Sequence, residues 1–245
     1  MLLHTASWPE VEAYLKTSKG IIIPIGSTEQ HGPNGLVGTD AICPEVIARE
    51  AGAEAGILVG PTFNVGVAQH HLGFPGSMTL RPTTMIAAIN DWIDSLARHG
   101  FEKIYFLNGH GGNIATIAAA FAESYANWSY DGEPCPYELK QMNWWELPGV
   151  MDVCRSLFPV GEGSHATASE VSVTYYAYPE HVKTVEMSPK IAPNGRFTDA
   201  DNYRKSFPDG RIGSDPAQAT PEKGATIVAA ARKALISDVK TFFSR

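Results

Sequence analysis

Cysteine, clustered basic residues and long apolar runs are all scarce in this sequence of 245 residues. The three cysteines stand far apart and none belongs to a CxxC pair, so we expect no disulfide framework and a cytoplasmic location. No block of Lys and Arg appears and the net charge is −7, which argues against nucleic acid as a partner. No apolar run approaches the roughly 20 residues of a membrane-spanning helix, and the N-terminus has no signal-peptide pattern, so we expect no membrane partner.

Strand-like and helix-like segments alternate along the chain, and this order predicts an α/β fold. Apolar or β-rich runs predict strands at 21–25, 57–60, 103–109 and 137–143. Helix-forming composition with caps predicts helices at 8–18, 40–55, 82–98, 112–127, 166–178 and 220–243. The stretch 188–220, rich in Pro, Gly and Asp, is expected to be irregular. The alternation indicates a single domain over residues 1–245, a three-layer α/β/α sandwich with a mainly parallel sheet.

Two candidate ligands follow the first predicted strand, at the edge where an open parallel sheet binds its ligands. Glu29 and His31 are separated by one residue, and such positions in an extended segment point to the same side. The glycine-rich stretch after them allows the chain to turn back, so that Asp40 returns at the start of the next helix. Glu, His and Asp together form a typical ligand set for zinc, manganese or iron.

A second imidazole, His110, follows the third predicted strand within the sequence NGHGGN. The glycines allow close backbone approach, and Asn113 is expected to cap the next helix. Each pattern alone is weak, because a lone ExH pair rarely binds metal and NGHGG is usually a turn with a surface histidine. Two histidines and two carboxylates at the ends of two strands are harder to dismiss, and together they favour a metal site over coincidence.

A third cluster, GEGSHATASEVSVT at 161–174, holds Glu162, His165 and Glu170. His165 and Glu170 are five residues apart, so their side chains would point about 140° apart within one helix. They can serve one site only if His165 precedes the helix and Glu170 lies within it. A surface helix with a solvated Glu is equally compatible with the sequence.

Four segments, taken in order, resemble the signature segments of the creatininase (creatinine amidohydrolase) family: PIGSTEQHGPNGLVGTD, FPGSMTL, NGHGGN and HATASEVS. The resemblance spans about residues 20–175, with a family-like GSDPAQATPEKG near the C-terminus. It implies a three-layer α/β fold and two divalent metal ions per chain, drawn from zinc, manganese or iron. It also implies hydrolysis of C–N bonds in small amides and a homo-oligomer, a hexamer in many members.

The resemblance also implies roles for individual residues. Matched motif to motif, His165 falls on a histidine that lies beside the metals and helps in proton transfer, and Asp40 falls on the bridging carboxylate. The implied metal ligands are Glu29, His31, Asp40, His110 and Glu170. The segment beginning at His165 lacks the Gly and the first acidic residue of the family's His-Ala-Gly pattern. Gly112 stands where true creatininases carry a metal-binding Glu, which argues against creatinine as the substrate and leaves Glu170 as the fifth protein ligand.

The predicted function is a metal-dependent amidohydrolase that attacks a small amide with a hydroxide activated by two divalent metals. A cyclic amide, a formamide and a short peptide are all compatible substrates. His165 is expected to act as general base and then as general acid, and the N–H groups of Gly111 and Gly112 are expected to stabilise the oxyanion. His71 and Trp145 are expected to line the substrate pocket, although an exposed loop imidazole and a core aromatic are equally compatible with these positions.

Two other functions compete with this prediction. Metal-assisted phosphoester hydrolysis is disfavoured because no Lys or Arg stands beside the predicted ligands. The second alternative, a non-catalytic metal- or ligand-binding protein of the same fold, is also compatible with the sequence. His165 discriminates between the last possibility and an enzyme, because a storage or scaffold role needs no titratable group beside the metals.

Overall fold

The computed structural model describes residues 1–244, and its centre is a four-stranded sheet in which all neighbouring strands run parallel. The strand order is β2-β1-β3-β4, built from β1 (Gly20–Ile25), β2 (Leu58–Val59), β3 (Lys103–Asn108) and β4 (Glu138–Asn143). The two central strands read GIIIPI and KIYFLN and are almost wholly buried. Continuous apolar runs of this kind are expected in strands that helices cover on both faces.

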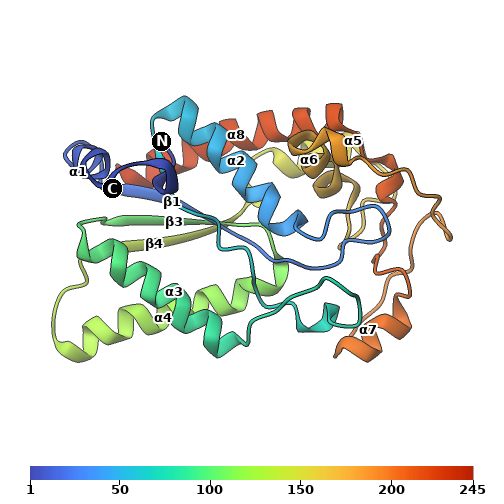
Figure 1. Cartoon of the computed structure of the whole chain (residues 1–245), viewed down its shortest axis with the longest axis horizontal. Coiled ribbons are helices and arrows are strands. Elements are labelled where there is room, and N and C mark those ends of the chain that lie inside the picture. The colour runs from blue at the N-terminus through green and yellow to red at the C-terminus, as the bar shows by residue number, and fades with distance from the viewer. Residues whose placement is uncertain (245) are drawn as a thin grey trace.

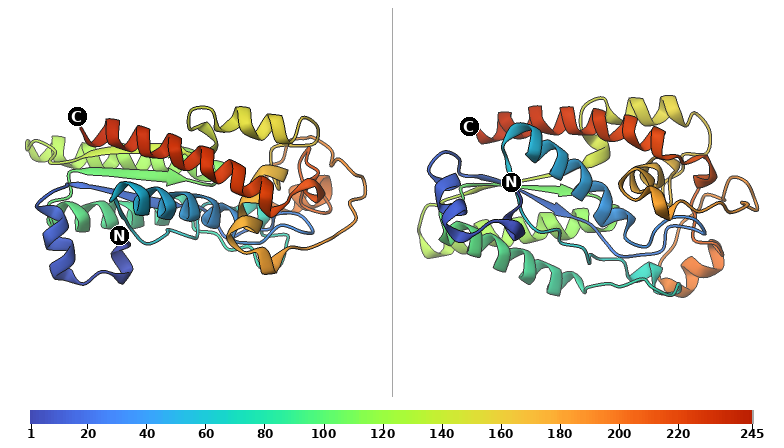
Figure 2. Two further views of the ribbon diagram at one scale, coloured as in Figure 1. Left: turned by 90° about the horizontal axis from the view of Figure 1, so that it is seen from above. Right: turned by 45° about the horizontal axis from the view of Figure 1, so that its top comes forward.

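Helices form a layer on each face of the sheet (Figure 1). One apolar core joins the sheet to α2 (Thr39–Ala55), α5 (Val150–Leu157), α6 (Ala168–Ala177) and α8 (Pro221–Phe243). A second core on the opposite face involves α1 (Trp8–Leu15), α3 (Pro82–Arg98) and α4 (Ile114–Asp131). Alternate strand residues divide between the cores: Ile22 packs in the first, Ile21 and Ile23 in the second. Figure 2 shows α8 running along the molecule beside α2. The predicted α/β/α sandwich is therefore confirmed.

The connections create a switch point between β1 and β3. The chain leaves β1 through α2 on one face, forms β2 at the edge, and returns through α3 on the other face to pair β3 with β1. Neighbouring strands whose helices leave on opposite faces open a crevice at their carboxyl ends. In Figure 1 the labels N and C lie near one end of the strands, and α7 (Ala200–Ser206) and the long loops lie beyond the other end.

Three local predictions differ from the structure. The stretch 188–220 is not wholly irregular, because Asp199 caps α7 through Asn202 N–H at 2.9 Å and Tyr203 anchors that helix in a small apolar cluster. The short helix α5 was not predicted. Asn113 stands at the N-cap position of α4, but its side chain makes no capping hydrogen bond; it accepts from Val67 N–H at 3.0 Å and donates to Gly26 O at 2.9 Å, and so links two distant loops.

None of the helices in residues 1–244 combines the length and the apolar character needed to cross a membrane.

Candidate metal centre

The start of α2 sits directly on the carboxyl ends of β1 and β3. Gly26 and Gly109 follow these two strands, and a Cβ atom at either position would lie 2.0 Å from the main-chain oxygen of Asp40. Only glycine permits this close approach. These two glycines thus allow the first turn of α2, which carries Asp40, to pack against the residues that directly follow β1 and β3.

The five predicted ligands converge at this switch point. His31 Nε2 lies 3.0 Å from Asp40 Oδ1 and 3.8 Å from Glu170 Oε1. His110 Nδ1 lies 2.8 Å from Asp40 Oδ2, and His110 Nε2 lies 3.3 Å from Glu29 Oε2. Four of the five side chains are buried, and that of Glu170 is 13% exposed. The segments that carry them are far apart in the sequence but meet in one cluster.

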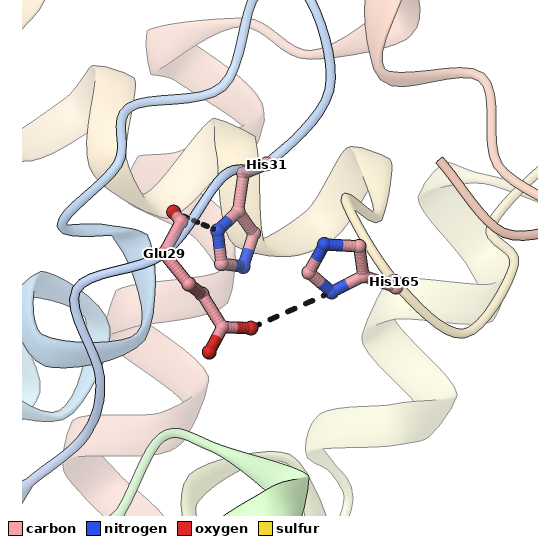
Figure 3. Close-up of side chains that lie close together, drawn as sticks. All are labelled: Glu29, His31 and His165. Carbon is pink, nitrogen blue, oxygen red and sulfur yellow. Dashed lines mark hydrogen bonds and ion pairs between the residues drawn. The ribbon is translucent and has the colours of Figure 1, made fainter. Parts of the chain in front are cut away.

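Three trios of side chains in this cluster offer ligand atoms that lie within 4.8 Å of one another. The trios are Glu29–Asp40–His110, His31–Asp40–Glu170 and Glu29–His31–His165. The first two share Asp40 and no other residue, which is the arrangement that a bridging carboxylate requires. Figure 3 shows the third trio, in which the Glu29 carboxylate points toward the His165 ring and the His31 ring lies next to that of His165, at 4.6 Å between centroids.

The unpaired carboxylate of Glu29 shows whether this cluster is suited to a metal ion. Glu29 is wholly buried, and neither of its oxygens accepts a hydrogen bond of acceptable geometry from the described residues. An unpaired buried carboxylate is costly unless a cation or a set of donors compensates it. The donor set combines carboxylate oxygens with imidazole nitrogens, which suits zinc, manganese or iron. The residues present therefore fit divalent metal ions.

The pKa values of the clustered side chains also indicate a site suited to a divalent cation. Burial opposes the charged form of His31 and His110, but the surrounding carboxylates raise their pKa values to about 10 and about 9. Burial likewise opposes the charge of Asp40, but the same two imidazoles hold the pKa of this carboxyl well below its usual range. Burial raises the pKa of Glu170 to about 7, against the effect of His31. Protonated imidazoles thus supply the positive charge here, and a divalent ion would displace those protons.

The start of α6 lets His165 and Glu170 face one site. Thr167 is the N-cap, so His165 precedes the helix and Glu170 lies in its first turn, as a shared site requires. Thr167 Oγ1 accepts from Glu170 N–H at 3.2 Å, and a Glu170 oxygen accepts from Thr167 N–H at 2.5 Å. His165 Nδ1 lies 3.9 Å from Glu29 Oε1 (Figure 3). Burial, with His31 nearby, lowers the pKa of His165, so the neutral ring can accept a proton.

A cavity of about 790 Å³ opens over this cluster. Four polar residues of the cluster face it: Asp40, His110, His165 and Glu170. Its apolar lining residues are Trp144, Trp145, Met151, Phe158 and Pro159, and its further polar lining includes Glu162, Ser164 and Thr167. Trp144 is buried in the core, whereas Trp145, the tryptophan expected in the substrate pocket, is half-buried at the cavity wall. Gly111 and Arg155 also line the cavity.

Two residues expected in the substrate pocket lie elsewhere. His71 is buried and does not line this cavity; its Nε2 lies 3.1 Å from Glu29 Oε1. Tyr203 of α7 packs edge-on against the His71 ring, at 4.6 Å between centroids, which explains why this loop imidazole is not exposed. Gly112 does not line the cavity either. A Cβ atom there would lie 2.4 Å from His110 Nε2, so the residue packs against an imidazole of the cluster.

Sequence reasoning missed Gln30, whose side chain contacts both His71 and His165. In a regular extended segment, a residue between Glu29 and His31 points away from their shared side. The alternation rule therefore offered no reason to single it out. The loop geometry after β1 instead brings its amide against two imidazoles of the site.

The parallel sheet with a cluster of carboxylates and imidazoles under a cavity at its switch point defines an α/β protein with a candidate metal site. The family model described as "Creatininase: Creatinine amidohydrolase" matches residues 4–239, so the chain belongs to the creatininase family. Its relatives are named as an amidohydrolase, a hydrolase and peptidases, and the chain is a hydrolase of this family.

Relatives with curated names cover most of the chain. Creatinine amidohydrolase of Pseudomonas putida is 26% identical over 235 residues, which cover 91% of this chain and 89% of that protein. The 3-dehydro-scyllo-inosose hydrolase of Thermotoga maritima is 28% identical over 248 residues, covering 94% and 76%. The mycofactocin precursor peptide peptidase of Mycolicibacterium smegmatis is 29% identical over 174 residues, covering 68% of this chain and 61% of that protein.

Solved creatininase structures share the fold. A mutant creatininase described as the Zn–Zn type superposes with a TM-score of 0.87 at 22% identity, covering 100% of this chain and 98% of that one. A structure described as "Creatininase Mn" gives a TM-score of 0.85 at 23% identity, covering 100% and 99%.

Proposed function

We propose that this hydrolase is a metal-dependent amidohydrolase that cleaves a C–N bond of a small amide. The observation that carries the proposal is the position of Asp40. It belongs to two trios of candidate ligands that share no other residue, and both Asp40 and Glu170 face the cavity. One carboxylate placed between two ligand sets at the floor of a cavity is what a two-metal hydrolase needs.

The ligand assignment follows from the two trios. Glu29, Asp40 and His110 would hold one ion. His31, Asp40 and Glu170 would hold the other. Divalent ions bound there would supply Lewis acidity, which lowers the pKa of water and polarises an amide carbonyl. Zinc and manganese are supported by the descriptions of related structures, and iron by the ligand set.

His165 is the residue proposed to move protons. Its ring lies beside Glu29 and His31, it lines the cavity, and its lowered pKa leaves it neutral near pH 7. A neutral imidazole in this place can take a proton from water and return it to the leaving nitrogen. The main-chain N–H of Gly111, at the cavity wall, is proposed to help bind the oxyanion.

The substrate is proposed to be a small amide other than creatinine. Glu170, which comes from α6 and lies near His31 and Asp40, is proposed to replace the ligand that Gly112 cannot supply. The cavity falls within the roughly 300–1,000 Å³ of small-molecule sites. One relative is named for creatinine and another for a precursor peptide. Cyclic amides, formamides and short peptides are therefore the compounds to screen.

Two measurements test the proposal. Metal analysis of protein purified with zinc or manganese should find two ions per chain, and a screen of small amides, formamides, lactams and short peptides should find a metal-dependent turnover. His165→Ala should keep both ions and lose turnover. A chain that binds fewer than one ion under metal-replete conditions contradicts the two-metal proposal. Full metal content with no turnover in the screen supports the non-catalytic alternative instead.

We also propose, from the family resemblance, a homo-oligomeric assembly with six chains, located in the cytoplasm. Light scattering coupled to size-exclusion chromatography tests the assembly, because a hexamer of this 26.4 kDa chain has six times its mass. A monomeric mass would contradict it.

A further inference from the structure

Gln30 lies at the centre of a buried network that touches two imidazoles of the site. Its side-chain nitrogen lies 2.9 Å from His71 Nδ1, 2.9 Å from His165 Nε2 and 3.0 Å from Gly210 O. Gln30 is 6% exposed and does not line the cavity, so it has no direct access to a substrate there. Its contacts must act through the two histidines.

The neighbours of the amide fix its orientation. Gln30 Oε1 accepts from the N–H of Gly32 at 2.9 Å, while Nε2 faces the carbonyl oxygen of Gly210 at 3.0 Å. The reversed amide would place its NH₂ against the Gly32 donor and its oxygen against the Gly210 acceptor. Both contacts would then be repulsive, so the side-chain nitrogen is the atom that faces the imidazoles.

This orientation determines the tautomer of His71. An amide nitrogen can only donate, so His71 Nδ1 must be the bare nitrogen that accepts from Gln30 at 2.9 Å. The ring hydrogen of His71 is then on Nε2, which lies 3.1 Å from Glu29 Oε1. The geometry of this second contact falls short of a hydrogen bond, but it places an N–H dipole beside a buried carboxylate whose oxygens accept no hydrogen bond from residues 1–244.

His165 contacts the same amide. Its Nε2 atom lies 2.9 Å from the Gln30 side-chain nitrogen and 2.9 Å from the Gln30 main-chain oxygen. With a hydrogen on Nε2, the ring donates to that oxygen but faces the amide as a second donor. With Nε2 bare, the ring accepts one amide hydrogen, and Gly210 O still accepts from the Tyr203 hydroxyl at 2.8 Å. Either arrangement leaves an amide hydrogen for His71, so the tautomer of His71 does not depend on that of His165.

We propose that Gln30 is a positioning residue that fixes His71 as the Nε2–H tautomer, so that the N–H of His71 faces Glu29 and holds this carboxylate in the metal-ligand cluster. The inference rests on the proposed function for its purpose, because only a site that binds metal or moves protons needs a fixed tautomer. Groups that orient metal ligands in this way typically change metal affinity about 10- to 100-fold when they are removed.

Neutron diffraction from deuterated crystals of the unmodified protein tests this tautomer directly. Deuterium is expected on Nε2 of His71, with Nδ1 of that ring bare. Deuterium on Nδ1 of His71 would overturn the proposal. The neutron experiment requires neither a variant nor an assay of enzymatic turnover.

The variant Gln30→Met tests the positioning role, because methionine has a similar shape and no hydrogen-bond donor. Its zinc affinity, measured by competition with a chromophoric chelator, should fall roughly 10- to 100-fold. Gln69→Met is the matched control: Gln69 is exposed in the same loop as His71, and zinc affinity should not change. Unchanged affinity in folded Gln30→Met would overturn the positioning role. A wild-type protein that binds no zinc would refute the proposed function, and the neutron map would still decide the tautomer of His71.

Discussion

Asp40 is the residue on which the whole candidate site depends. It offers one oxygen to His31 at 3.0 Å and the other to His110 at 2.8 Å, and it is the only residue common to the two proposed ligand sets. We expect Asp40→Asn to lose both ions rather than one, because neither pair of remaining ligands is sufficient. Metal analysis after dialysis measures this. Asp91→Asn, the same change on the exposed face of α3, should keep both ions.

The result that would contradict a shared carboxylate is the retention of one ion at full occupancy by Asp40→Asn. In that case the two trios would be independent sites, and the bridging role would belong to another residue.

Alanine at Gly112 and alanine at Gly111 are expected to differ in their effect on zinc binding, although the two glycines are neighbours. A Cβ atom at Gly112 would lie 2.4 Å from His110 Nε2 and 2.6 Å from Val67 O, whereas nothing lies within 4 Å of one at Gly111. Overpacking of this kind costs about 1–3 kcal/mol and displaces the neighbouring group. Gly112→Ala should therefore weaken zinc binding by displacing His110, and Gly111→Ala should not.

The same geometry predicts that Gly112→Glu will not restore the creatininase pattern. The added carboxylate must push His110 aside before it can reach an ion, so zinc affinity should fall, as measured by chelator competition. Equal zinc affinity in Gly112→Ala and Gly111→Ala would show that the loop yields without moving His110.

At the scale of elements, the first turn of α6 combines a helix cap with a metal ligand. Thr167 and Glu170 form a reciprocal capping box, so the same hydrogen bonds that start the helix also orient the Glu170 carboxylate. Thr167→Val removes the hydroxyl but keeps the shape. We expect a loss of about 1 kcal/mol in the free energy of unfolding, measured with denaturant, and weaker zinc binding because Glu170 is less well held.

Thr220 provides the matched control for this prediction. It caps α8 by accepting from Lys223 N–H at 3.3 Å, and it does not line the cavity. Thr220→Val should lose a similar free energy of unfolding and keep its zinc affinity. If both variants bind zinc equally well, the cap at α6 supports the helix only, and the orientation of Glu170 has another source.

The elements differ in how far the sequence predicts them. The central strands and α2, α3, α4 and α8 were predictable because long apolar runs and caps are local signals. Helices α5 and α7 were not predicted, because α5 begins after Gly149 with no capping side chain and α7 lies in a stretch whose Pro, Gly and Asp content indicates a loop. The side chain of Asn113 was assigned to a helix cap because its true partners, Val67 and Gly26, lie far away in the sequence.

On the scale of the whole molecule, the candidate site was predictable where strand ends determine it. Glu29, His31 and His110 follow adjacent central strands, so the rule for parallel sheets places them together. The environment of His71 was not predictable, because Tyr203 comes from α7, more than a hundred residues later in the chain. The same segment supplies Gly210 to the Gln30 network. The region rich in Pro, Gly and Asp thus covers the rear of the site, although its composition indicates only a loop.

Because the site joins loops after β1 and β3 to α2 and α6, metal binding should stabilise the whole molecule. A ligand that binds only the folded state adds RT ln(1 + [L]/Kd), or about 2.7 kcal/mol when its free concentration is 100 times Kd. We expect zinc to raise the unfolding temperature of chelator-treated protein in differential scanning calorimetry, and Asp40→Asn to abolish the shift. Zinc that raises the unfolding temperature of Asp40→Asn equally would be binding elsewhere. No shift in the wild-type protein would mean that the carboxylates and imidazoles at this switch point hold no ion.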